Sequence, residues 1–382
     1  MPQIAVLSLR SYSCTMAPRI LLPLLLALAL PADDKIPRGK SKKAEPAPAN
    51  LVWPGPPERP RIRFVAVIQG ADDVTGKRKP SFVERMSGKP AEGEQLRLSK
   101  PYGVAVDQAG KIYVADPEKR GVLVFDRENK TASLRKGNAQ FPLFLPICVT
   151  TDRDGRMYVS DSFAEQVVVF DPDGKPVAAF GKGTFKRPGG LAINAERGWL
   201  YVVDVKRNEV MIFDLRTLAL VKVFGGSSKS GEFEPGTLSG PTNIALDASG
   251  RVYVSDTFNC RIQVFDPSGR FLRSFGSQGV RPGSFLRPKG VAVDHQGHVY
   301  VVDAGFNNFQ IFTPEGKPLL FVGSGGDAPG QFLLPAGMAI DHQDRIYVTE
   351  QRPAGSRLQI FEFLPEQPAS PQGGGKVERR IQ

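Results

Sequence analysis

Six acidic residues recur at one position of a repeated motif, where carboxylates could act together as a ring. Tyr-Val and one further residue precede each acid, and the acids are Asp116, Asp161, Asp204, Asp256, Asp303 and Glu350. Carboxylates gathered on one face could hold a divalent cation. They could instead cap their own loops by accepting backbone N–H groups. Because every copy carries the acid, whereas chemistry normally breaks such symmetry, we interpret the six as structural loop caps.

Positions that differ between the copies are better candidates for a ligand site. Each copy opens with a Pro and a short apolar run, and we predict ligand binding by the polar and aromatic residues beside these Pro residues: Tyr102, Arg187, Thr242, Asn243, Arg287 and Lys289. A divalent site needs several oxygen or nitrogen ligands, and Asn243 has no carboxylate or imidazole beside it at these positions. We therefore predict no metal, no cofactor and no catalytic residue.

The three histidines lie away from these positions, in sequences typical of tight turns. His295 and His298 flank one such turn, and His342 lies in the matching turn of the next copy. A surface metal site is one interpretation, and solvated turn histidines are the simpler one. We find no Ser/His/Asp or Cys/His arrangement, no phosphate loop and no haem-attachment pair. The three Cys residues do not form a disulfide framework.

The spacing of the copies predicts a repeat architecture. The opening Pro residues are Pro101, Pro146, Pro188, Pro241, Pro288 and Pro335. A roughly constant period in this range indicates stacked structural units.

Each copy has the composition of four short strands. In the fourth copy these are "NIALD", "RVYVSD", "RIQVFD" and "FLRSFG", and the turn sequences "DASG" and "DPSG" join the first and last pairs. Val, Ile, Tyr and Phe favour strands, whereas Asp, Pro and Gly favour tight turns. No helical period interrupts them, so parallel βαβ units are excluded.

These patterns predict an all-β fold, a six-bladed β-propeller with four-stranded antiparallel blades. The last copy lacks a fourth strand, and an orphan strand-like segment, "RIRFVAVIQG" (61–70), precedes the first copy. We predict that this N-terminal strand completes the last blade, because an open ring would leave two sheet edges unpaired. The loops after the second and fourth strands of each blade share one face, which we call the top face.

Residues 61–364 resemble NHL-repeat proteins of the bacterial, exported type. The pattern P-x-G-V-A-V-D-x-x-G-x-x-Y-V-x-D…R-I-Q-V-F-D-x-x-G stands nearly whole at residues 241–269, and with small departures at residues 288–316. The resemblance implies the propeller fold, and one fold hosts many functions. Related six-bladed lactonases and amidating lyases hold Ca²⁺ or Zn²⁺ near the axis, which leaves open a metal-dependent hydrolase or lyase. Some eukaryotic relatives bind RNA, which leaves nucleic-acid binding open as a second alternative.

The two ends of the chain have the composition of processing and linker segments. We predict a signal peptide at 1–32, with Met16 as a second candidate start, and export to the periplasm or cell envelope. A Pro- and Lys-rich linker is expected at 33–60 and a disordered tail at 365–382. The net charge of +11 resides mainly in residues 1–100. The blades are nearly neutral, which argues against a nucleic-acid partner.

An insertion of about 30 residues at 71–100 separates the orphan strand from the first copy. We predict that it lies over the top face near the channel mouth and binds a partner through the basic and apolar residues Lys77, Arg78, Lys79, Phe82 and Met86. The predicted function is non-catalytic binding or scaffolding by a monomer, with a protein partner or a small polar ligand on the top face. Peripheral contact with a membrane is a further expectation.

Overall fold

The computed structural model describes residues 51–76, 95–231, 234–353 and 355–364. All of them belong to one compact unit, Glu45–Gln382. The predicted signal peptide and C-terminal tail lie outside the described residues, as does the predicted linker up to residue 50.

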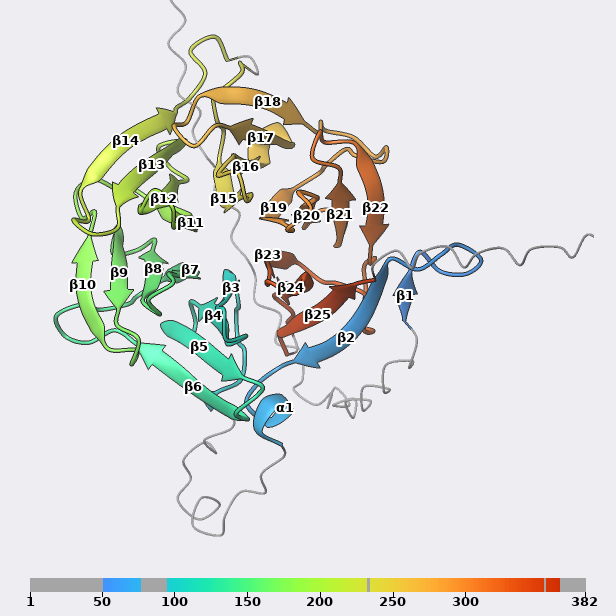
Figure 1. The fold of residues 1–382 in the computed structure, drawn as a ribbon, viewed down its shortest axis with the longest axis horizontal. Helices are drawn as coiled ribbons and strands as arrows, with labels where there is room; N and C mark the ends of the chain where they lie inside the picture. Colours follow the sequence, from blue (N-terminus) through green and yellow to red (C-terminus); the bar gives the residue numbers. More distant parts are fainter. Residues whose placement is uncertain (1–50, 77–94, 232–233, 354, 365–382) are drawn as a thin grey trace, which may run out of the picture. The chain divides into compact units, whose positions relative to one another are not determined.

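Six antiparallel sheets stand around a central axis (Figure 1). Blade 1 consists of β3 (Val104–Val106), β4 (Ile112–Asp116), β5 (Gly121–Asp126) and β6 (Thr131–Lys136). Blade 2 consists of β7 (Pro146–Thr151), β8 (Met157–Asp161), β9 (Gln166–Phe170) and β10 (Pro176–Phe180). Blade 3 consists of β11 (Pro188–Asn194), β12 (Trp199–Asp204), β13 (Glu209–Asp214) and β14 (Leu220–Gly225).

The remaining blades follow the same order from axis to rim. Blade 4 consists of β15 (Pro241–Leu246), β16 (Val252–Asp256), β17 (Arg261–Phe265) and β18 (Phe271–Phe275). Blade 5 consists of β19 (Pro288–Val293), β20 (Val299–Asp303), β21 (Asn308–Phe312) and β22 (Pro318–Val322). Blade 6 begins with β23 (Pro335–Ile340), β24 (Arg345–Glu350) and β25 (Arg357–Phe363). The predicted all-β, six-bladed propeller is therefore confirmed.

The N-terminal strand closes the ring. β2 (Ile62–Ile68) pairs antiparallel with β25, so the blue and red parts of the chain lie side by side in Figure 1. Ile62 pairs with Phe363 and Ile68 pairs with Leu358. Both Ile side chains are buried, which explains why a strand remote in sequence docks here.

A short strand outside β2 corrects the predicted domain boundary at residue 61. β1 (Val52–Trp53) pairs with β2, and the rings of Trp53 and Phe361 meet edge to face at 5.7 Å. The prediction of a linker through residue 60 is therefore wrong for this stretch. The Pro residues that suggested a tether flank the strand, and its indole still packs against blade 6.

The turns on the bottom face are held by a repeated Asp–Tyr pair. In blade 4, Gly250 (φ +78°) closes the turn between β15 and β16. Asp247 Oδ1 accepts from the N–H of Arg251, and the Tyr253 hydroxyl donates to Asp247 Oδ2 at 3.1 Å. The recurring Tyr of the motif thus fixes its turn, in the pairs Asp107–Tyr113, Asp152–Tyr158, Asp294–Tyr300 and Asp341–Tyr347 as well.

The hydrophobic core lies between neighbouring blades. Tyr201 and Ile212 of blade 3, for example, pack with Ile244 and Phe265 of blade 4. Strands buried on both faces read as near-continuous apolar runs, which is why the second and third strands do not alternate.

The innermost strands approach one another closely at the axis. A Cβ atom on Gly190 would lie 2.7 Å from Asn243 Cα of the next blade, and one on Gly337 would lie 2.0 Å from the carbonyl oxygen of Tyr102. Only glycine fits at these contacts. The ring of inner strands therefore fixes the positions of the side chains that point into the channel.

Helix is scarce in the part of the chain that the structure describes. Apart from Gln95, the helical residues there belong to α1 (Asp72–Thr75) and one 3₁₀ turn, η1 (Thr257–Asn259). Neither has the length or apolar composition of a membrane-spanning helix, and no other described segment does.

Candidate functional site

The six acids that end the second strands are buried at the top face and bind loop backbone. Their side chains have no exposed surface. Asp161 accepts from the N–H groups of Leu145 at 3.0 Å, Phe163 at 3.0 Å and Ala164 at 2.8 Å. One carboxylate thus ties the loop that enters a blade to the loop that follows its second strand. This is the geometry of a loop cap.

In blades 4 and 6, the Arg and Gln of the R-x-Q motif complete this cap. Arg261 Nε donates to Asp256 Oδ2 at 2.8 Å, and Gln263 Nε2 donates to the same oxygen at 2.9 Å. Arg261 also donates to the carbonyl of Thr237 in the entering loop. Glu350 is held in the same way by Arg357 and Gln359. These buried charges are therefore satisfied within their own blade.

Two predicted ligand residues meet across the channel. Tyr102 lies two residues before β3 of blade 1, and Lys289 lies in β19 of blade 5. The Lys289 ammonium lies 5.2 Å from the centroid of the Tyr102 ring, a cation–π contact between blades that are not neighbours. Both side chains are half-buried.

Two arginines stand at the same mouth. Arg187 and Arg287 directly precede the Pro residues that open β11 and β19, and both are exposed. The cap acids position them, because Asp204 Oδ1 accepts from Arg187 N at 3.1 Å and Asp303 Oδ1 accepts from Arg287 N at 3.0 Å. Within the described residues, no acidic side chain pairs with either guanidinium or with Lys289.

The electrostatics of the mouth reflect this unbalanced positive charge. Burial raises the pKa of Tyr102, although Arg287 and Arg187 oppose the rise. Burial, together with Arg287, lowers the pKa of Lys289 from its ordinary value of 10.5 to about 8. Blades 1, 3 and 5 therefore contribute to one basic, partly dehydrated site, which we call the channel-mouth cluster: Tyr102, Arg187, Arg287 and Lys289. An anion that entered it would restore the missing counter-charge.

The other two predicted ligand residues take part in local contacts instead. The hydroxyls of Thr242 and Thr257 lie 2.7 Å apart, and Asn243 Oδ1 accepts from the N–H of Ile244 at 2.7 Å. Near them, the buried Ser255 hydroxyl has no partner among the described residues. Its counterpart Ser160 donates to a carbonyl of the next blade, so the boundary between blades 4 and 5 departs from the repeat.

No metal-binding group is present among the described residues, because no three His, Cys, Asp or Glu side chains are placed to share an ion. The histidines lie in the bottom turns. His298 Nδ1 lies 2.9 Å from Asp294 Oδ2, and His295 pairs with Asp344. His342 lines a cavity of about 530 Å³ between blades 6 and 1.

The predicted partner-binding insertion leaves the blade at its outer edge. Gly70 bridges to Arg97, and Val74 of α1 packs beside Ile68 and Leu98. α1 contacts β6, the outermost strand of blade 1 (Figure 1). The prediction that the insertion lies over the top face near the channel mouth is therefore wrong for Asp72–Thr75, which packs at the outer edge of blade 1. At the other end, Ser99 N and Lys100 N donate to the cap acid Asp116 on the top face. The insertion's predicted binding residues, Lys77, Arg78, Lys79, Phe82 and Met86, lie outside the described residues.

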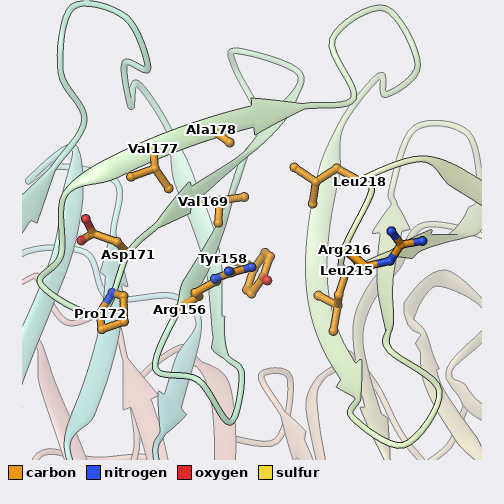
Figure 2. A pocket seen from close by; sticks show the side chains of 10 residues that line it. All are labelled: Arg156, Tyr158, Val169, Asp171, Pro172, Val177, Ala178, Leu215, Arg216 and Leu218. Atoms are coloured by element: carbon orange, nitrogen blue, oxygen red, sulfur yellow. The ribbon is translucent and has the colours of Figure 1, made fainter.

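A cavity of about 390 Å³ separates blades 2 and 3 on the bottom side, and the sequence did not indicate it. Figure 2 shows Val177 and Ala178 of β10 on one side and Leu215 and Leu218, from the turn after β13, on the other. Its lining is largely aliphatic.

The sequence reasoning also missed the aromatic residues of the top loops. Phe163 and Phe258 each stand two residues after a cap acid, and they are 72% and 73% exposed. An alignment of the six copies would have revealed them, since the other copies carry Glu118, Lys206, Gly305 or Arg352 at this position.

Known proteins share this architecture. A family model described as a 6-bladed beta-propeller (DUF5128) matches residues 237–309. A Caenorhabditis elegans protein named as a probable peptidyl-alpha-hydroxyglycine alpha-amidating lyase, pgal-1, is 32% identical over 99 residues. That match covers 26% of this chain and 28% of the relative. A mouse peptidyl-glycine alpha-amidating monooxygenase is 35% identical over 101 residues, 26% of this chain and 10% of that protein. This chain therefore aligns with less than a third of either curated relative.

Solved structures match more of the chain at lower identity. A Bacteroides thetaiotaomicron protein of unknown function has a TM-score of 0.57 at 16% identity and covers 79% of this chain and 76% of its own. Virginiamycin B lyase from Staphylococcus aureus has a TM-score of 0.51 at 14% identity, with coverage of 70% and 96%. A Xanthomonas campestris gluconolactonase has a TM-score of 0.52 at 18% identity, with coverage of 70% and 87%. At these identities the likeness shows the six-bladed fold alone.

Proposed function

We propose that this protein is a binding propeller that recognises an anionic group of its ligand at the channel mouth of the top face. The observation that carries the proposal is the meeting of Lys289 and Tyr102 across the channel, with Arg187 and Arg287 beside them and no acidic partner among the described residues. Cations held at fixed positions in a partly dehydrated recess attract carboxylate or phosphate more strongly than solvated surface cations.

The scaffold suits recognition because it orders the site before the ligand arrives. The backbones of Arg187 and Arg287 are fixed by buried carboxylates, and inner strands in close contact fix Tyr102 and Lys289. A preorganised site loses less conformational entropy on binding.

Calorimetric titration with benzoate, citrate and phosphate tests the proposal. We expect at least one of these anions to bind the wild-type protein. Its affinity for the Lys289→Met variant should be lower by about tenfold or more. Lys317→Met is the matched control, because Lys317 is exposed in a bottom turn. The proposal would be wrong if none of the three anions bound, or if Lys289→Met and Lys317→Met bound them equally well.

A lyase is the second candidate function, because two curated relatives bear the names of amidating enzymes. Conversion of a peptidyl-alpha-hydroxyglycine to the peptide amide can be followed by mass spectrometry, with and without added Zn²⁺ or Ca²⁺. Turnover that is lost in Lys289→Met or Tyr102→Phe would favour this function. Absence of turnover under all of these conditions would rule out the lyase function, and binding would remain as the proposed function.

We also infer that the six copies are NHL repeats and that the protein works outside the cytoplasm as a monomer. The motif at residues 241–269 supports the first inference, and the apolar stretch Ile20–Leu30 after Arg19 supports export. Fractionation of cells that express the full chain would test its location.

A further inference from the structure

The top loops carry exposed apolar side chains around the channel-mouth cluster. Phe163 of blade 2 and Phe258 of blade 4 are the most exposed of them, at 72% and 73%. The others immediately precede first strands or lie one residue further back: Phe144, Leu145, Leu286 and Leu334. Together these six residues form what we call the apolar rim. Exposed apolar groups gathered on one face indicate an interaction surface.

Contacts within the top loops hold the aromatic side chains of the apolar rim in place. The rings of Phe144 and Phe163 are 5.6 Å apart, and the backbone N–H groups of both residues donate to Asp161. Phe258 lies against Gly240, where a Cβ atom would come within 2.5 Å of its ring. Phe258 N also donates to the carbonyl of Ser239 at 3.1 Å. Their exposure is thus a fixed feature of the folded loops.

Charge and shape together indicate the kind of partner. Blade 3, which carries Arg187, lies between the blades of Phe163 and Phe258, and Lys289 is half-buried in the channel. A flat lipid surface would reach the rim but not a recessed ammonium. A polypeptide can insert a carboxylate into the mouth while its neighbouring apolar side chains cover the rim. Aromatic residues, Phe among them, and Arg are also enriched at protein interfaces.

We propose that the top face binds an extended peptide segment of a partner protein, in which a carboxylate enters the channel mouth beside Lys289 and apolar neighbours pack on Phe163 and Phe258. This inference rests on the proposed function, because it assigns a peptide as the source of the anion. The apolar rim then supplies contact area, and the channel-mouth cluster selects for negative charge.

Selection from a phage-displayed library of random peptides of about 12 residues, with the intact protein as bait, tests the proposal. We expect enrichment of Asp or Glu flanked by Leu, Ile or Phe within about three positions. Synthetic copies of the selected peptides should lose about tenfold or more in affinity for Lys289→Met and for the double variant Phe163→Ser/Phe258→Ser. Changing the peptide acid to its amide should cause a similar loss.

Two controls separate this role from general destabilisation. Phe321→Ser removes a 59% exposed Phe from the outer strand β22, and Lys317→Met removes a bottom-face charge, so both should bind the peptides like wild type. All variants should retain the circular dichroism spectrum of the wild type.

Several outcomes would overturn the proposal. They are a selected pool without acidic residues, peptides that bind the rim variants unchanged, and binding only to phosphatidylglycerol vesicles through Phe163 and Phe258. If benzoate, citrate or phosphate binds through Lys289 but no peptide does, this inference is wrong and the proposed function stands. If neither small anions nor peptides bind, both are wrong.

Discussion

Lys289 is the residue on which the proposed site depends most, because its charge changes near neutral pH. Burial and the neighbouring Arg287 lower its pKa to about 8, and no carboxylate among the described residues compensates. The ammonium form that binds an anion therefore predominates below this pH and is lost as the pH rises through it.

This protonation predicts a falling pH profile for anion binding. Between pH 8 and 10 the affinity of wild type for benzoate, or for whichever anion binds, should fall toward that of Lys289→Met, about tenfold or more in total, because neutral Lys289 no longer contributes its charge. Lys289→Arg should abolish the fall, because a guanidinium stays charged over this range. Calorimetric titrations at five pH values would reveal this difference in pH dependence. Parallel pH profiles for wild type and Lys289→Arg would contradict the prediction.

Asp256 illustrates the structural role of the cap acids. It is fully buried and accepts from Ser239 N at 2.6 Å, as well as from Arg261 and Gln263. Removing one member of a buried charged pair leaves the other charge buried without its counter-ion, which is strongly destabilising.

We therefore expect Asp256→Ala to lower the free energy of unfolding by about 3 kcal/mol in urea denaturation. Glu315→Ala removes an exposed acid from a bottom turn and should change it by less than about 0.5 kcal/mol. A stable Asp256→Ala variant would instead favour a role in ligand binding for the acid ring.

At the scale of elements, β2 determines whether blade 6 is complete. Its two faces differ, since Ile62 is fully buried in the core between blades 5 and 6, whereas Val65 is 38% exposed at an irregularity in the pairing. One strand therefore supplies both a test position and its control.

Ile62→Ala should destabilise the fold by about 3 kcal/mol, because it leaves a cavity in a packed core. Val65→Ala should cost less than about 1 kcal/mol. Equal effects in urea denaturation would mean that β2 does not pack on blade 6 as described.

At the scale of the molecule, the propeller is a circle, and its closure joins residues about 300 positions apart in sequence. Without β1 and β2, strand β25 would become a free sheet edge and the aromatic cluster around Phe361 would lose Trp53 and Phe64. Unpaired edges of this kind promote association between chains.

A truncation that begins at residue 71 should therefore unfold at lower temperature and aggregate, as seen by calorimetry and size-exclusion chromatography. A truncation that begins at residue 51 keeps every described strand, and we expect it to unfold in a single transition as a monomer. Indistinguishable behaviour of the two proteins would contradict closure by β2.

The repeat, the strand content and the closing segment can all be predicted from the sequence. These are encoded locally: the Tyr-Val-x-acid motif, the Asp-x-x-Gly turns and the strand at Ile62–Ile68 carry their own periodicity and turn chemistry. The repeat also predicts that Tyr102, Arg187, Arg287 and Lys289 lie beside the starts of first strands.

Which of these residues come into contact depends on the three-dimensional fold. Tyr102 and Lys289 contact each other from blades on either side of blade 6, a proximity that arises from ring curvature and channel width rather than from sequence spacing. Thr242 and Asn243 occupy equivalent positions but take local partners, and Trp53 joins a sheet from within a Pro-rich stretch. Side-chain direction and packing across the ring set these outcomes, and neither is encoded in a local pattern.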